Sequence, residues 1–239
     1  MALRYKYKQP LILFLCAFVS LWFIGSSCKN HNHPDKKIFH YNESSGLASL
    51  DPAFAKNKQV MWSTHQLYNT LIEIDSNMQM QPSLATHWNI SEDNLVFTFI
   101  LRNDVFFTDD ACFTNGKGRK LTAHDVEYSF KRIIDKSTAS PGAWIFNNRV
   151  DSVNGFTAIN DTTFQLKLIS PFQSILGILS MQYCSIIPKE AVEKYKTDFR
   201  RHPVGTGPFS FVAWEEGQAL ILKKNENYFE KDAAGNRLP

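Results

Sequence analysis

Alternating side chains predict the best defined strands of the chain. Along residues 95–102 both alternating sets are rich in large apolar residues, which predicts a strand covered on both faces. Residues 163–169 alternate in a similar way. Two further alternating runs, 209–214 and 219–223, are joined by a short polar segment that contains Gly217, and we expect them to form a hairpin.

Helical spacing of apolar residues predicts the clearest helix after Thr122. Apolar side chains then recur at intervals of three and four residues up to Ile134, which is typical of an amphipathic helix. Thr122 and Asp125 have the spacing of a capping box, with aspartate in place of the usual glutamate. Two more helices are predicted at 59–70 and 188–195, the second with a proline at its start.

Shorter apolar runs predict further strands at 37–41, 71–74 and 105–108. The last of these follows the strand at 95–102 closely, so we expect the two to pair through a tight turn. Strands and helices thus alternate in type along the chain, and several strands are joined as hairpins. This pattern predicts a mixed α/β or α+β body rather than a helical bundle or a single barrel.

Composition and charge argue against a disordered chain and against a nucleic-acid-binding protein. With 44% hydrophobic and 21% charged residues, the chain of 239 residues has enough apolar material for a sizeable core. The formal charge is +3, from 26 basic and 23 acidic residues. Residues 1–27 contain three basic residues, Arg4, Lys6 and Lys8, and no acidic residue, so the rest of the chain has 23 basic and 23 acidic residues. A formally neutral body has no basic stripe for a nucleic-acid backbone, so we expect no nucleic-acid partner.

The first 28 residues have the pattern of an export signal followed by a lipid attachment site. Three basic residues precede an apolar stretch at 11–24, which is shorter than the roughly 20 residues that cross a bilayer. Small residues then lead into Cys28, a pattern that resembles the lipobox of bacterial lipoproteins, although Gly25 stands where a branched aliphatic residue is usual. We expect a signal peptide at 1–27, lipid on Cys28 and a flexible tether at 28–37. The alternative is an ordinary signal peptide that leaves Cys28 as a free thiol.

Two cysteines remain in the body, Cys112 and Cys184. A compartment outside the cytoplasm permits a disulfide between them, but one pair is no disulfide framework. A bond and two buried free thiols both remain open.

Motifs of enzymes and cofactor sites are missing from the sequence. It has no Gly-x-Ser-x-Gly elbow, no His-Glu-x-x-His pair and no phosphate-binding Gly-x-x-x-x-Gly-Lys loop. His31 and His33 lie in the predicted tether without a second pair of ligands nearby. We therefore expect no catalytic residues, no metal site and no cofactor, and we expect that some of the many aromatic residues line a binding cleft.

Seven runs, in a fixed order, give the sequence its resemblance to a known family. They are Ser49–Pro52 (Ser-Leu-Asp-Pro), 93–107, 119–132, 138–141 (Thr-Ala-Ser-Pro), 187–192, 202–209 and 225–229. In this order they resemble the bacterial extracytoplasmic solute-binding proteins of family 5, the dipeptide- and oligopeptide-binding lipoproteins of ATP-driven importers. Family members run to roughly twice this length, so the resemblance covers their N-terminal half only.

The resemblance implies a two-lobed fold of the class II periplasmic-binding-protein type, here truncated so that the opposing lobe is missing. It implies a first part of lobe I at 38–68, a family-specific extra subdomain at 69–186 and a return to lobe I at 187–239. The implied function is capture of peptides and delivery to the permease subunits of an ABC importer. The protein would then be periplasmic and held at the membrane by its lipid. The chain alone should not close on a ligand, and it should expose an apolar face where the second lobe belongs.

Two segments correspond to places where relatives touch their ligand. The loop after Ser49–Pro52 contributes Lys56, Asn57 and Lys58, and the segment after the Thr-Ala-Ser-Pro run contributes Gly142, Ala143 and Trp144. Some relatives present an aromatic ring at the position of Gly142, whereas here the aromatic ring comes two residues later. For Trp144 the alternative is a buried anchor between elements.

Other functions remain open. The same fold also serves non-peptide cargo such as a metal chelate, haem or a sugar, and the chain could be a non-functional truncated fragment. An anchored enzyme or assembly protein is a further class, which would require a nucleophile with a base nearby.

Overall fold

A computed structural model describes residues 37–238. The chain divides into two units, residues 1–42 and 43–239. In the first unit the described residues 37–42 form neither helix nor strand, so the strand predicted at 37–41 is wrong. The proposed signal peptide, the lipid site at Cys28 and nearly all of the tether lie outside the described residues. Within the described residues, no helix has the length and apolar character needed to cross a membrane.

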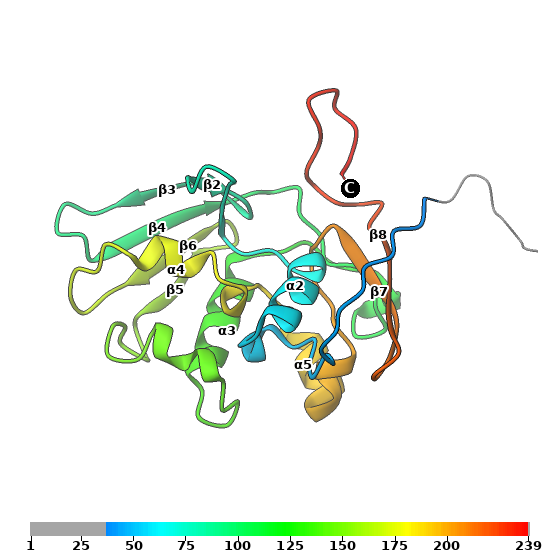
Figure 1. The fold of residues 1–239 in the computed structure, drawn as a ribbon. Coiled ribbons are helices and arrows are strands. Elements are labelled where there is room, and N and C mark those ends of the chain that lie inside the picture. Colours follow the sequence, from blue (N-terminus) through cyan, green and yellow to red (C-terminus); the bar gives the residue numbers. More distant parts are fainter. Residues whose placement is uncertain (1–36, 239) are drawn as a thin grey trace, which may run out of the picture. The chain divides into compact units, whose positions relative to one another are not determined.

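The second unit is built from three antiparallel sheets with helices between them (Figure 1). The strands are β1 (Ile72–Ile74), β2 (Met80–Pro82), β3 (Ala85–Ile90), β4 (Val96–Leu101), β5 (Phe156–Asn160), β6 (Thr163–Lys167), β7 (Phe209–Glu215) and β8 (Ala219–Lys224). The helices are α2 (Lys58–Leu67), α3 (Ala123–Ile134), α4 (Ile175–Leu179) and α5 (Lys189–Tyr195). Short 3-10 helices are η1 (Pro52–Phe54), η2 (Thr114–Gly116), η3 (Pro141–Ile145), η4 (Gln182–Cys184) and η5 (Lys196–Arg201).

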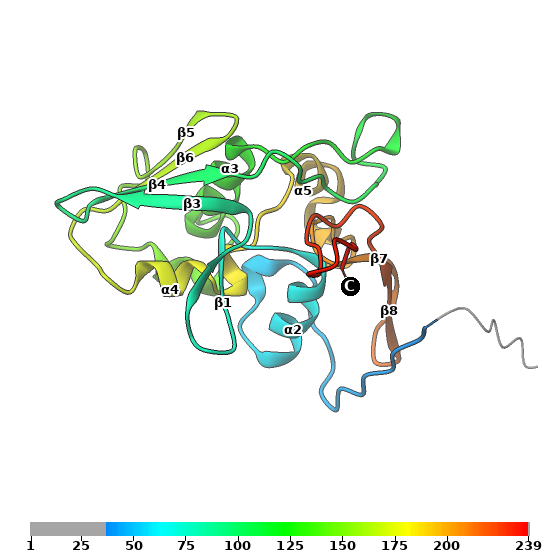
Figure 2. The same cartoon turned by 90° about the horizontal axis from the view of Figure 1, so that it is seen from above.

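The largest sheet has the order β3-β4-β6-β5, and α3 packs against β5 and β6. The β7–β8 hairpin lies apart from this sheet, which Figure 2 shows from above. The mixed fold class, the hairpin and the helix after Thr122 are as predicted, and Thr122 and Asp125 form the expected capping box. The partition of this unit at residues 68 and 186 stays a prediction.

Aromatic side chains fill the space between α3 and the sheet. Phe130 on α3 lies against Phe146, Phe156 and Phe164, with ring centroids 5.1, 5.8 and 5.5 Å away. These four rings are buried, and Phe164 also contacts Phe99 of β4. The apolar face predicted for this helix thus forms the centre of the core.

Three details differ from the sequence-based predictions. One face of β4 is fully buried and the other only half-buried, because α3 covers a single face of the sheet. The segment 105–108 does not pair with β4, since β3 and β6 occupy both edges of that strand; Phe107 donates instead to Arg119 O at 3.0 Å. The helix predicted at 59–70 ends at Leu67, where Tyr68 takes up an extended conformation.

The two body cysteines are free thiols. Cys184 is buried, whereas Cys112 is half-buried, so the alternative of two buried thiols holds fully only for Cys184. Burial raises the pKa of the Cys112 thiol to about 12, and a hydrogen bond to Asp110 adds to this effect. Burial also raises the pKa of Cys184. Neither thiol is poised to react as a thiolate.

Candidate functional site

Three 3-10 helices that are far apart in sequence pack together near α3. They are η1, η3 and η4, and we call them the three-helix junction. Residues 142–144 lie within η3, and residues 56–58 come shortly after η1, with Lys58 as the first residue of α2. The contact between η1 and η3 therefore brings the chain just before residues 56–58 close to the segment 142–144, two regions that the sequence analysis named separately.

Asp51 fixes the start of η1. Its carboxylate accepts a hydrogen bond from Ala53 N at 3.0 Å, which caps the short helix. The same carboxylate accepts two bonds from Arg132 of α3, at 2.9 Å from Nη1 and 2.6 Å from Nη2. The side chains of Asp51 and Arg132 are only 5% and 13% exposed, so this is a two-pronged ion pair shielded from water.

Ser140 joins η1 to η3. Its hydroxyl donates to Ala53 O at 2.6 Å and accepts from Gly142 N at 3.0 Å. Gly142 in turn packs on the ring of Tyr183 in η4, where an added Cβ would lie 2.5 Å from Cδ1. The position next to the ring thus requires a glycine, which explains why no aromatic side chain stands at residue 142.

The first candidate segment has structural roles as well as exposed charge. Asn57 is the N-cap of α2 and its Oδ1 accepts from Val60 N at 3.0 Å, so its side chain is engaged within the chain. Lys56 and Lys58 are exposed, and the Lys58 ammonium lies 5.3 Å from the ring centroid of Trp62.

The second candidate segment offers one aromatic ring to solvent. Trp144 is 46% exposed, so the alternative of a buried anchor is wrong. Its carbonyl oxygen accepts from Arg149 Nη1 at 2.6 Å, which holds the backbone at that point. Ala143 O accepts from the amides of Phe146 and Asn147. Trp144 is therefore the member of this segment with a side chain available to a ligand.

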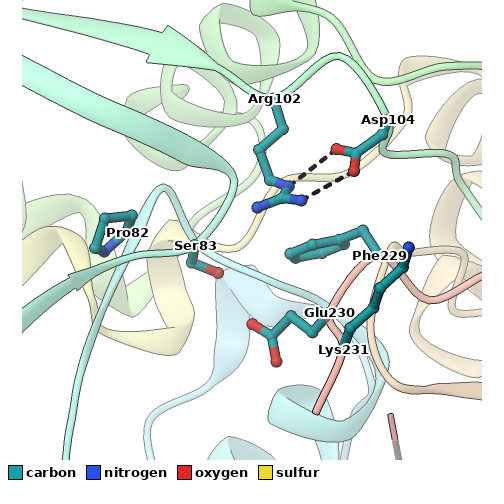
Figure 3. A pocket seen from close by; sticks show the side chains of 7 residues that line it. All are labelled: Pro82, Ser83, Arg102, Asp104, Phe229, Glu230 and Lys231. Atoms are coloured by element: carbon teal, nitrogen blue, oxygen red, sulfur yellow. Dashed lines mark hydrogen bonds and ion pairs between the residues drawn. The ribbon is translucent and has the colours of Figure 1, made fainter. Parts of the chain in front are cut away.

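A pocket of about 380 Å³ lies elsewhere in this unit (Figure 3). Its lining comes from three separate parts of the chain: Pro82, Ser83, Arg102, Asp104, Phe229, Glu230 and Lys231. Arg102 binds Asp104 through Nε at 3.0 Å and Nη2 at 2.9 Å. Its guanidinium also lies 4.8 Å from the ring centroid of Phe229.

Sequence reasoning missed this pocket. Arg102 and Phe229 fall within the runs that carry the family resemblance, but no spacing rule brings residues so far apart in sequence together. Burial raises the pKa of Glu230, and repulsion from Glu73 adds to this effect. Within residues 37–238, no group of three His, Cys, Asp or Glu side chains is arranged to hold a metal ion.

Comparison with known proteins gives consistent matches. The model of "Bacterial extracellular solute-binding proteins, family 5 Middle" matches residues 79–238. The peptide transport periplasmic protein SapA of Salmonella typhimurium is 29% identical over 69% of this chain and 32% of its own length. Heme-binding protein A of Haemophilus influenzae is 30% identical over 74% of this chain and 34% of its own length.

Among solved structures, DppA from Helicobacter pylori in complex with the peptide STSA matches 78% of this chain and 38% of its own, with 32% identity and a TM-score of 0.68. The chain thus spans about a third of the length of the curated relatives it matches. The fold is that of class II periplasmic binding proteins, over part of their length. Since the family model covers more than half of the chain, this protein belongs to the bacterial extracellular solute-binding proteins of family 5.

Proposed function

We propose that this protein captures peptides outside the cytoplasm and delivers them to an ATP-driven membrane importer. The observation that supports peptides most directly is the Helicobacter pylori relative, which holds a peptide and matches 78% of this chain. A lipid on Cys28 would keep the receptor beside the permease, with 28–37 as the tether. We assign 38–68 and 187–239 to one lobe and 69–186 to the extra subdomain.

The segments 56–58, after η1, and 142–144, within η3, are the proposed ligand contacts. An extended peptide is held in such proteins by main-chain hydrogen bonds, while hydrated pockets accept varied side chains. Trp144 offers an exposed ring for an apolar side chain, and Lys56 and Lys58 offer positive charge to a carboxylate. Asn57 and Gly142 contribute through the backbone, because the side chain of the first caps α2 and the second has none.

Native mass spectrometry of the protein purified from the cells that make it tests the cargo. In the full-length protein, with both lobes present, we expect co-purified peptides and, after these are removed, binding of the synthetic peptide Ser-Thr-Ser-Ala measured by calorimetry; the chain of 239 residues alone is not expected to close on a ligand. Trp144→Ala should weaken that binding about tenfold, the effect of losing about 1.4 kcal/mol at a contact. Phe106→Ala is the matched control, because Phe106 is equally exposed at 46% and lies outside both segments. Equal loss in both variants, or no peptide in any preparation, would contradict the assignment.

Haem is the second candidate cargo, favoured by the similarity to heme-binding protein A over 74% of this chain. The same preparation distinguishes it, since bound haem absorbs strongly near 400 nm and a peptide does not. The lipid anchor is tested separately: Cys28→Ser should release the protein from the membrane fraction, and retention of that variant would refute the anchor.

A further inference from the structure

We propose that Ser140 is a positioning residue, which couples the two candidate ligand segments into one fixed arrangement. The importance of this arrangement for peptide binding rests on the proposed function, while the coupling itself is a property of the fold. Ser140 is buried and its hydroxyl is bonded to Ala53 and Gly142, so it acts through these two residues.

The hydroxyl of Ser140 is the direct link between η1 and η3. Its proton goes to Ala53 O, and its oxygen receives the amide proton of Gly142, so both of its hydrogen-bonding roles are used. Ser140 is buried, and water is therefore not at hand to replace it. Removing the hydroxyl leaves the carbonyl at Ala53 and the amide at Gly142 without this partner.

Neighbouring contacts hold each side of the link in place. Asp51 caps η1 at Ala53 N and is bound to Arg132, so η1 is anchored to α3. On the other side, Gly142 lies against the ring of Tyr183 and cannot approach it further. The Ser140 hydroxyl therefore ties the start of η3 to η1, and residues 55–58 follow η1 directly in the chain.

A second buried serine provides a matched control. Ser129 on α3 also donates to a backbone carbonyl, Asp125 O at 2.7 Å, and accepts from a backbone amide, Ile187 N at 3.0 Å. Ser129→Ala therefore removes an equivalent hydroxyl from the same unit, but it leaves both candidate segments untouched. A loss of stability alone should affect both alanine variants alike.

Amide hydrogen exchange, followed by mass spectrometry, tests the coupling in the purified protein. In Ser140→Ala we expect exchange to speed up about tenfold or more in both 49–58 and 138–146, with the core of α3 unchanged. Ser140→Thr keeps the hydroxyl and should restore slow exchange. Ser129→Ala should leave both segments as they are in the wild type.

Binding of Ser-Thr-Ser-Ala by the same variants, made in the full-length two-lobed protein, supplies the functional readout. The dissociation constant should rise about tenfold in Ser140→Ala, return toward the wild type in Ser140→Thr and stay unchanged in Ser129→Ala. Unchanged exchange in Ser140→Ala, or equal changes in Ser129→Ala, would overturn the coupling. If the full-length wild type binds no peptide, the proposed function fails, and hydrogen exchange still decides whether Ser140 couples the segments.

Discussion

The ion pair between Asp51 and Arg132 gives the sharpest test of how this fold is held together. Arg132→Met keeps most of the side-chain volume, and it removes both bonds to the carboxylate together with the guanidinium that lies 5.5 Å from the ring centroid of Phe199. The carboxylate of Asp51 is 5% exposed and would keep only the bond from Ala53 N. Breaking a buried pair in this way costs about 3–5 kcal/mol, because the remaining charge is left without its partner.

Urea unfolding followed by tryptophan fluorescence measures this loss. A domain of this kind is stable by about 5–15 kcal/mol, so the midpoint should fall substantially while the slope stays constant. The control is Arg200→Met, because Arg200 also binds a carboxylate, Glu216, but both side chains are nearly half exposed. Such a surface pair contributes about 0–1 kcal/mol.

A double variant separates the charge effect from other losses. Asp51→Asn keeps an oxygen that can cap η1 at Ala53 N and removes the negative charge. If the buried charge causes the loss, Asp51→Asn combined with Arg132→Met should be more stable than Arg132→Met alone. A loss below about 1 kcal/mol in Arg132→Met, or no recovery in the double variant, would refute the reasoning.

Three further predictions concern the packing, a half-buried acid and a buried thiol. Gly205→Ala should lower the melting temperature in calorimetry, because its Cβ would lie 2.2 Å from Leu67 O; Gly46→Ala has open space and should not. The pKa of Glu230 is raised by burial, so the stability due to its neutral form is full below the ordinary value of 4.5 and is lost as the pH rises through the folded value. Glu230→Gln should therefore match the wild type near pH 4 and be more stable at pH 7 in urea unfolding. Cys184 should resist iodoacetamide at pH 8 in the native protein and react in urea, as peptide mapping would show, because burial keeps its thiol protonated and covered.

The sequence pattern correctly predicted those helices and strands whose ends are set by residues close in sequence. The helix after Thr122 has both its cap and its apolar face in its own sequence, and the β7–β8 hairpin is defined by two alternating runs and a turn. The strand expected at 105–108 failed for a non-local reason. Its apolar residues suit a strand, but β4 already has a partner on each edge, which only the order of the whole sheet determines.

The candidate site was only partly predictable for the same reason. The sequence nominated both segments through a resemblance, and it could not show that Ser140 joins them or that Tyr183 excludes a side chain at residue 142. It also could not show that Asn57 is a helix cap, although asparagine before a helix is a common signal of one. The exposure of Trp144 depends on η3 as a whole and has no local signature.

Several of the runs that carry the family resemblance bind one another in the folded chain. Asp51 in the first run pairs with Arg132 at the end of another, and Arg119 of that same run binds Glu190 with Nε and Oε1 2.6 Å apart. Ser140, in the Thr-Ala-Ser-Pro run, bonds to the residue directly after Pro52. A change at Asp51 or Arg132 therefore leaves a buried partner unsatisfied in another run, which is a physical reason for these two runs to occur together. The runs that carry the resemblance therefore mark mainly the framework that positions the ligand segments. They mark the ligand contacts themselves less directly.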